Sequence, residues 1–116
     1  MTVSFVTYLR VSTERQGQSG LGLEAQRAAV AVHVLGRGEV VAEFVEVESG
    51  KRSDRPELAR ALAEAKRAGA VLLIAKLDRL ARNVAFIANL LESGVEVTAA
   101  DMQEANRFVL HIMAAV

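Results

Sequence analysis

Short apolar runs typical of strands alternate along this chain with segments whose apolar residues recur at helical spacing. Strands that alternate with helices at this pace fold into a mostly parallel sheet with right-handed crossovers and with helices on both faces. The sequence therefore predicts a three-layer α/β domain. The predicted strands cover residues 3–11, 40–47, 71–76 and 95–100, and the predicted helices cover residues 23–35, 56–68, 84–91 and 105–116.

The size and composition of the chain narrow its class. A chain of 116 residues suits one domain, and a domain of this length buries roughly two thirds of the surface that its unfolded chain exposes. The absence of cysteine excludes disulfides and a thiolate zinc site. We find no secretory leader and no apolar run near the roughly 18 residues of a membrane span. We therefore expect a cytoplasmic protein that binds no membrane, no metal and no cofactor.

The charges of the chain balance, with 14 basic and 14 acidic residues. This balance argues against a grip on nucleic acid through bulk charge, because phosphate-driven affinity scales with the cations brought to the backbone. Arginine nevertheless outnumbers lysine eleven to three. Guanidinium groups bind phosphate bidentately and stay charged, so the bias fits phosphate chemistry. It fits GC-rich coding equally well.

A polar cluster stands where the first predicted strand ends. Tyr8, Arg10 and Ser12 occupy every second position there, and this spacing puts their side chains on one face of the strand. A second arginine-bearing stretch, residues 76–82, follows the predicted strand that begins at Val71. Open α/β sheets bind their ligands at the carboxyl ends of the strands. The two stretches therefore predict one basic site.

These residues resemble the catalytic domain of the serine recombinases, the resolvase and invertase family. In that family a Tyr-x-Arg-x-Ser stretch carries the nucleophile and an Asp-Arg-x-x-Arg stretch completes the site. Further pieces of this chain stand in the order that the family shows, so the resemblance covers nearly its whole length. The matching pieces are Tyr8-Leu9-Arg10-Val11-Ser12, Gln26, Ser49-Gly50, Ser53-Asp54-Arg55-Pro56 and Asp78-Arg79-Leu80-Ala81-Arg82.

The resemblance implies site-specific DNA recombination through a covalent intermediate. Ser12 would attack a DNA phosphodiester to give a 5′-phosphoserine and a 3′ hydroxyl, and strand exchange and religation would follow without ATP or a metal ion. Guanidinium groups would stabilise the charge that builds up on the phosphate oxygens. The implied catalytic residues are Ser12, Arg10, Arg79, Arg82, Arg55, Asp78 and Tyr8, and Gln26 and Ser49 are the implied substrate-binding residues.

The residues define some of these implied roles more closely than others. Asp78 would orient Arg10 or Ser12, and the group that deprotonates Ser12 is not identified. Tyr8 taken alone is also compatible with a packing aromatic whose hydroxyl is satisfied. Two positions depart from the family pattern: Asn83 stands where an aspartate is common, and Glu46 stands where a shorter acid is often found.

The resemblance also predicts what the chain lacks. Family members extend their last helix into a separate DNA-binding domain, so residues 1–116 are expected to be one catalytic domain truncated in that helix. We expect DNA to be bound through the full-length protein, which would form dimers or tetramers. The isolated chain would be inactive.

Two other functions stay open at this stage. An assembly or regulatory module would use an apolar face on the last predicted helix, formed by Phe108, Val109, Ile112, Met113 and Val116. A small phosphohydrolase or nucleotide-binding domain would use the same kind of sheet, although neither G-x-G-x-x-G nor G-x-x-x-x-G-K-[ST] is present. His33 and His111 accompany no G-x-S-x-G motif, so both are interpreted as structural.

Overall fold

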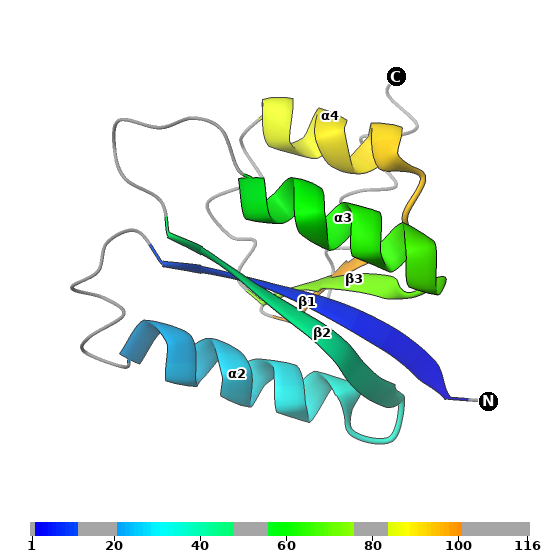
Figure 1. Cartoon of the computed structure of the whole chain (residues 1–116). Coiled ribbons are helices and arrows are strands. Elements are labelled where there is room, and N and C mark those ends of the chain that lie inside the picture. Colours follow the sequence, from blue (N-terminus) through cyan, green and yellow to red (C-terminus); the bar gives the residue numbers. More distant parts are fainter. Residues whose placement is uncertain (1, 12–20, 48–55, 76–83, 101–116) are drawn as a thin grey trace.

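The computed structural model describes residues 2–11, 21–47, 56–75 and 84–100. Strands and helices alternate through these ranges, as the sequence predicts (Figure 1). No helix within these ranges is long and apolar enough to cross a membrane. In chain order the elements are β1 Val3–Val11, α2 Leu21–Val34, β2 Gly38–Val47, α3 Pro56–Ala68, β3 Val71–Ile74, α4 Val84–Ser93 and β4 Val97–Ala99.

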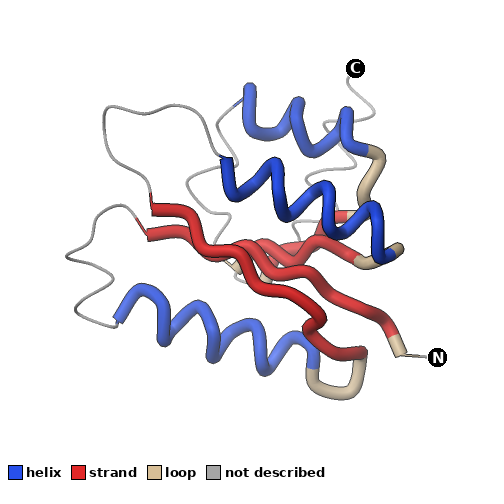
Figure 2. The backbone as a smooth tube through the Cα atoms, in the orientation of Figure 1, coloured by secondary structure: helices blue, strands red, loops and turns tan. Residues whose placement is uncertain are grey.

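The four strands form one sheet in the order β2-β1-β3-β4, and all three pairings are parallel. Helix α2 covers one face of the sheet, and α3 and α4 lie on the other (Figures 1 and 2). This arrangement confirms the predicted three-layer α/β fold. The predicted helix at residues 105–116 lies outside the described residues.

The buried apolar residues that the structure describes form two clusters, one on each face of the sheet. Val6 and Tyr8 of β1 pack with residues of α3 such as Leu58. Phe5 and Leu9 of the same strand point to the opposite face, where they belong to the cluster that includes α2. Since successive side chains of a strand alternate between faces, a strand covered on both sides must be apolar along its length.

Strand β3 shows the same rule in its shortest form. Leu72, Leu73 and Ile74 are each no more than 1 % exposed. A run of consecutive apolar residues, without alternating polar ones, indicates a strand that is buried on both faces. Gly69 stands between α3 and β3 with a φ of +64°, the left-handed conformation with which helices commonly end.

Candidate functional site

The candidate site lies at the carboxyl edge of the sheet. Strands β1, β2 and β3 are parallel neighbours that end at Val11, Val47 and Ile74. The chain therefore leaves the sheet at one edge after each of these strands. Each departing segment carries predicted site residues, which agrees with the general position of ligand sites in parallel sheets.

The structure describes three of the nine predicted site residues: Tyr8, Arg10 and Gln26. The other six lie outside the described residues, so their positions and roles stay predictions. They are Ser12, which follows β1 directly, Ser49 and Arg55 between β2 and α3, and Asp78, Arg79 and Arg82 between β3 and α4.

Gln26 holds the end of β1 through its side-chain amide. The backbone N–H of Arg10 donates to Gln26 Oε1 at 3.0 Å, and Gln26 Nε2 donates to the backbone carbonyl of Arg10 at 2.8 Å and to that of Gly22 at 3.0 Å. Gln26 is only 6 % exposed. All the polar atoms of its amide therefore serve the backbone of β1 and α2 in this structure.

The position of Gln26 follows from where β3 ends. Within the described part of the chain, the last backbone contact from the β3 side to β1 is the N–H of Ala75, which donates to the carbonyl of Tyr8 at 3.0 Å. The N–H and C=O of residues two apart in a strand point to the same side, so those of Arg10 face the side where β3 has stopped. The amide of Gln26 takes the place of a further strand residue there.

Arg10 is half-buried and pairs in register with Glu46 of β2. Its neighbour two positions earlier, Tyr8, lies in the cluster on the α3 side of the sheet. Alternation along the strand places the side chain of Arg10 on that same side. Tyr8 and Arg10 therefore share one face, as predicted.

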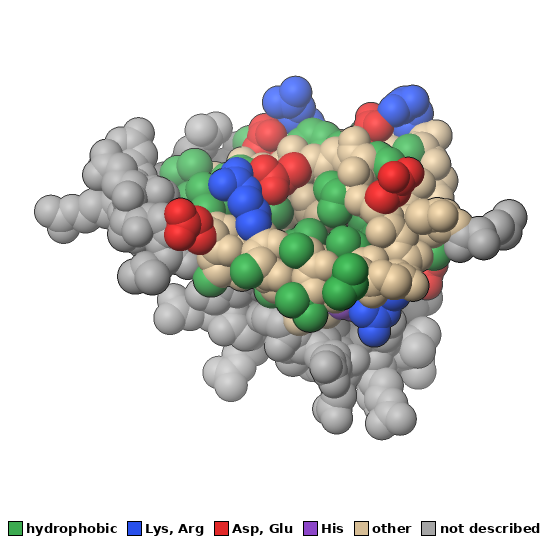
Figure 3. All heavy atoms as spheres, turned by 90° about the horizontal axis from the view of Figure 1, so that it is seen from below, with side chains coloured by type: hydrophobic (Ala, Val, Ile, Leu, Met, Phe, Trp, Pro, Cys, Tyr) green, Lys and Arg blue, Asp and Glu red, His purple; other side chains and the backbone are tan. Residues whose placement is uncertain are grey.

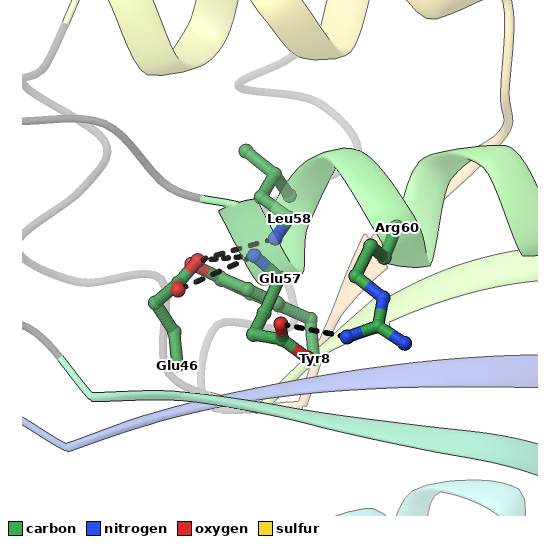
Figure 4. A network of polar contacts seen from close by, with 5 residues as sticks. All are labelled: Tyr8, Glu46, Glu57, Leu58 and Arg60. Atoms are coloured by element: carbon green, nitrogen blue, oxygen red, sulfur yellow. Dashed lines mark hydrogen bonds and ion pairs between the residues drawn. The ribbon is translucent and has the colours of Figure 1, made fainter.

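Tyr8 is buried below this edge and belongs to a polar network with Glu46. Its hydroxyl donates to Oε1 of Glu46 at 3.1 Å (Figure 4), and Tyr8 is 1 % exposed. In this structure the ring packs in the core cluster on the α3 side of the sheet. Its predicted catalytic role stays a prediction.

Glu46 was not among the predicted site residues, and the structure places it at the amino end of α3. Its Oε1 also accepts from the backbone N–H groups of Glu57 and Leu58, each at 3.1 Å, and its Oε2 accepts from the N–H of Glu57 at 3.3 Å (Figure 4). These N–H groups belong to the first turn of α3, where a helix lacks intrahelical acceptors. A carboxylate there is also favoured by the helix dipole.

A sequence signal for Glu46 does exist. Ala42 and Phe44 of β2 pack against the cluster on the α3 side, and Glu46 continues their two-residue period. An acidic side chain on the same face of the strand as core residues is buried, and it then needs hydrogen-bond or ion-pair partners. Glu46 is 3 % exposed. Ser53 and Asp54, which precede Pro56 in the sequence, lie outside the described residues.

A groove of about 1080 Å³ opens elsewhere, between α2 and the sheet. It lies on the α2 face of the sheet, where it runs past Val3, Phe5 and Val71. Tyr8 and Arg10 lie on the α3 face, so these two predicted site residues do not line it. His33 lines it and meets the ring of Phe5 edge-on, with 6.0 Å between ring centres. Burial, and secondarily the charge of Arg37, lowers the pKa of His33 below its ordinary value.

The described part of the surface seen from the α2 side has no concentration of one charge. Basic and acidic side chains are interspersed with hydrophobic ones over its described part (Figure 3). One such pair joins Arg27 of α2 to Glu43 of β2 at 3.0 Å. Among the described residues no three acidic or histidine side chains are placed to hold a metal ion.

Comparison with known proteins gives one family match and several structural ones. The family described as "Resolvase, N terminal domain" matches residues 5–116. No curated protein sequence matches the chain.

Three solved structures share the fold of the chain. The N-terminal catalytic domain of TP901-1 integrase is 21 % identical, with a TM-score of 0.68 over 97 % of this chain and 92 % of that one. The C-terminal catalytic domain of ISC1926 TnpA, an IS607-like serine recombinase, is 20 % identical, with a TM-score of 0.63 over 97 % and 80 %. A resolvase family site-specific recombinase from Streptococcus pneumoniae is also 20 % identical, with a TM-score of 0.63 over 98 % and 87 %.

Proposed function

The chain belongs to the resolvase N-terminal domain family, and from this we propose that it catalyses site-specific DNA recombination with Ser12 as the nucleophile. The observation that carries the proposal is the family match over residues 5–116, because that range includes all nine predicted site residues. The described geometry supports it, since β1, β2 and β3 end at one edge of the sheet.

The proposed reaction is a phosphoryl transfer to serine. The Oγ of Ser12 attacks a DNA phosphorus, an Oγ–P bond forms, and the bond from phosphorus to the 3′ oxygen breaks. The serine proton ends on the departing 3′ oxygen, through a carrier that we leave unassigned. The phosphoserine link conserves the phosphodiester bond energy, so religation by the reverse step requires no ATP.

Guanidinium groups stabilise the transition state in this proposal. Arg10, Arg55, Arg79 and Arg82 offset the negative charge on the non-bridging oxygens, and Asp78 orients Arg10 or Ser12. Arg10 is the one of these that the structure describes. Its backbone is fixed on both polar atoms by Gln26, and such fixed placement is what makes an electrostatic contribution effective.

Gln26 and Ser49 were predicted to bind substrate. We propose that Gln26 contributes by ordering the strand that leads to Ser12, because its amide is already engaged with backbone groups. Ser49 remains a proposed hydrogen-bond donor to DNA.

We further propose that DNA is the partner of the full-length protein, that this protein self-associates to dimers and tetramers, and that it acts in the cytoplasm. The balanced charge of 14 basic and 14 acidic residues supports a division of labour in which a separate segment supplies most of the DNA affinity. The competing assembly module depends on residues 108–116, which lie outside the described residues.

The test uses the full-length protein that contains this chain and a randomised duplex DNA library. Denaturation with detergent should trap a covalent protein–DNA adduct, and mass spectrometry should locate the phosphate on Ser12. The cleaved DNA should carry free 3′ hydroxyls that terminal transferase can label. Residues 1–116 alone should leave duplex DNA uncut in a gel assay.

The decisive variant is Ser12→Ala, which should abolish the adduct and leave DNA binding unchanged. Ser4→Ala, at the other end of the same strand, is the matched control and should react like the wild type. An adduct that persists in Ser12→Ala, or that maps to another residue, would refute the proposed mechanism.

A further inference from the structure

Helix α2 is apolar on two opposite sides. One side packs on the sheet through buried residues such as Gln26 and Val30. A helix turns by about 100° per residue, so Ala28 and Val32 lie on the side that points away from the sheet. Val32 is 72 % exposed, and Leu35, at the end of the helix, is 79 % exposed. Hydrophobic side chains accordingly lie on the described surface of the α2 side (Figure 3). A helix that is apolar all round is normally covered by another element.

The exposed apolar residues of α2 form a regular line, which we call the α2 seam. Its members are spaced three, four and three positions apart, and they are Ala25, Ala28, Val32 and Leu35. All four are exposed. This is the spacing at which paired helices contact each other. Leu35 follows the last residue of α2, and its N–H still donates to the carbonyl of Ala31 at 3.2 Å, so the seam continues through the final turn.

The α2 seam is complementary to itself when two copies lie antiparallel. Its small residues stand in the first half of the helix and its large residues stand near the end. An antiparallel pair centred on residue 30 sets Leu35 of one copy opposite Ala25 of the other. The same pair sets Val32 opposite Ala28, and both contacts occur twice because the arrangement is two-fold symmetric. A parallel pair would instead set small residues against small ones and large residues against large ones.

The charges at the ends of the seam favour the same orientation. Glu24 stands in the first turn of α2 and Arg37 stands just beyond its end, and both residues are exposed. Arg37 Nη1 donates to the carbonyl of His33 at 2.6 Å, which holds the guanidinium beside the end of the helix. Antiparallel pairing brings Glu24 of each copy next to the turn that holds Arg37 of the other, so that opposite charges meet at both ends.

The groove beside α2 does not account for the seam. Its described lining includes Ala28 and Val32 but neither Ala25 nor Leu35. A segment that filled the groove would therefore cover only one flank of the seam, whereas a second α2 covers its whole length. The seam also lies on the side of the sheet opposite to the cluster that contains Tyr8, so this contact does not obstruct the α3 side.

We propose that the α2 seam is a self-association surface, on which α2 of a second copy of this chain packs antiparallel in a two-fold symmetric contact. A seam about 15 Å long buries less surface than the roughly 800 Å² per partner of a stable interface. The contact is therefore weak between free chains and becomes effective where copies are held close together on DNA. In this respect the inference rests on the self-association proposed above, whereas its test requires neither DNA nor a reaction at Ser12.

Cysteine cross-linking tests the inference directly, because the chain has no cysteine of its own. Ala28→Cys and Val32→Cys are prepared as separate variants of residues 1–116, mixed, and exposed to a glutathione redox buffer. A disulfide forms only where the two Cα atoms come within about 7 Å of each other. The product that joins the two different variants should be at least about tenfold more abundant than either product that joins identical variants, well above the roughly twofold excess of random pairing. Mass spectrometry after proteolysis identifies each product.

The matched control is a mixture of Ala59→Cys and Ala63→Cys, at two exposed positions of α3 with the same four-residue spacing. This mixture should cross-link only as random collisions allow. A charge exchange provides a second measurement by sedimentation equilibrium. Glu24→Arg and Arg37→Glu should each weaken self-association by about three- to tenfold, and an equimolar mixture of the two should restore it, because opposite charges then meet at both ends.

Three results would overturn the inference. If the Ala28→Cys and Val32→Cys mixture cross-links no faster than the α3 control, something other than a second copy covers the seam, such as residues 101–116 or another protein. If products that join identical variants dominate, the helices do not pair antiparallel. If the charge variants associate like the wild type, the ends of the helices do not meet as proposed. Should one cysteine variant fail to fold, Ala25→Cys and Leu35→Cys provide the same comparison.

The result for the α2 seam is independent of the result for the proposed reaction. A Ser12-dependent DNA adduct without the α2 cross-link contradicts this inference alone. The α2 cross-link without any adduct from the full-length protein contradicts the proposed reaction alone.

Discussion

Replacing the buried residue Gln26 by alanine should strongly destabilise the domain. The substitution removes three hydrogen bonds, at 2.8–3.0 Å, that join α2 to itself and to the end of β1. Each typically contributes about 0.5–1.5 kcal/mol net, and a buried group left without a partner costs about 1–3 kcal/mol. Because Arg10 is half-buried, water can replace part of what is lost.

We therefore expect a loss of about 2–4 kcal/mol in the free energy of unfolding. Unfolding entropy near 2.1 cal/mol/K per residue makes 1 kcal/mol equal to about 4 °C for a chain of this length, so the melting temperature should fall by about 8–16 °C. Thermal and urea unfolding followed by circular dichroism would measure both quantities on the isolated domain.

Arg27→Ala is the matched control because it alters the adjacent residue of the same helix. Its side chain is about half exposed and pairs with Glu43 at the surface, and such pairs contribute about 1 kcal/mol or less. If Gln26→Ala destabilises the domain no more than Arg27→Ala does, the amide of Gln26 does not hold β1 and the reasoning is refuted.

Three further predictions concern the core, the tight contact of two strands, and pH. Leu72→Ala, in a strand residue that is fully buried, should cost about 2–5 kcal/mol in urea unfolding, and a smaller loss would mean that the core repacks. Gly38→Ala should lower the melting temperature more than Gly69→Ala does. A Cβ at Gly38 would stand 1.9 Å from the carbonyl oxygen of Val3 in β1, whereas a Cβ at Gly69 meets nothing within 4 Å and is opposed only by the positive φ of that residue. Equal melting temperatures of the two variants would contradict this. Burial and the charge of Arg37 lower the pKa of His33 in the folded protein below its ordinary value of 6.5. Below pH 6.5 the unfolded chain therefore binds more protons at His33 than the folded protein does. The free energy of unfolding should fall as the pH is lowered from about 6.5 toward the pKa of the folded state. His33→Asn should lose less stability than the wild type over that interval, and parallel melting curves would contradict the assignment.

The elements of the fold were predictable because each is decided by a local pattern. The continuous apolar run at Val71 gave β3, and apolar residues at helical spacing gave α3. Its buried stripe was predicted at Leu58, Ala59, Leu62, Ala63 and Ala65 and was only partly right, because Ala61 is buried whereas Ala59 and Ala63 are exposed. Boundaries were less well defined. The last strand was predicted over residues 95–100 and covers Val97–Ala99, since apolar residues next to a short strand carry the same signal whether or not they pair.

The polar contacts of the site were harder to predict because they join residues that are distant in sequence. Gln26 was expected to bind substrate near the site, and its observed partners are the backbone groups of Arg10 and Gly22. Nothing in the helix period around Gln26 says that β3 ends before β1 does. That difference in strand length decides where the amide is needed.

The same difference in length bears on the end of β1, which leads to the proposed nucleophile Ser12. A strand that extends beyond its neighbour has unpaired backbone N–H and C=O groups on that side. Such a segment frays unless other groups form hydrogen bonds with these polar atoms. Here Gln26 meets them from one face of the sheet, and β2 continues beside β1 as far as the pair Val11 and Val47. β1 thus extends beyond its pairing with β3, and the backbone of Arg10 is still held by hydrogen bonds. If the proposed chemistry is right, Gln26 orders the backbone of Arg10, two residues before Ser12, at a point of β1 that lies beyond its pairing with β3.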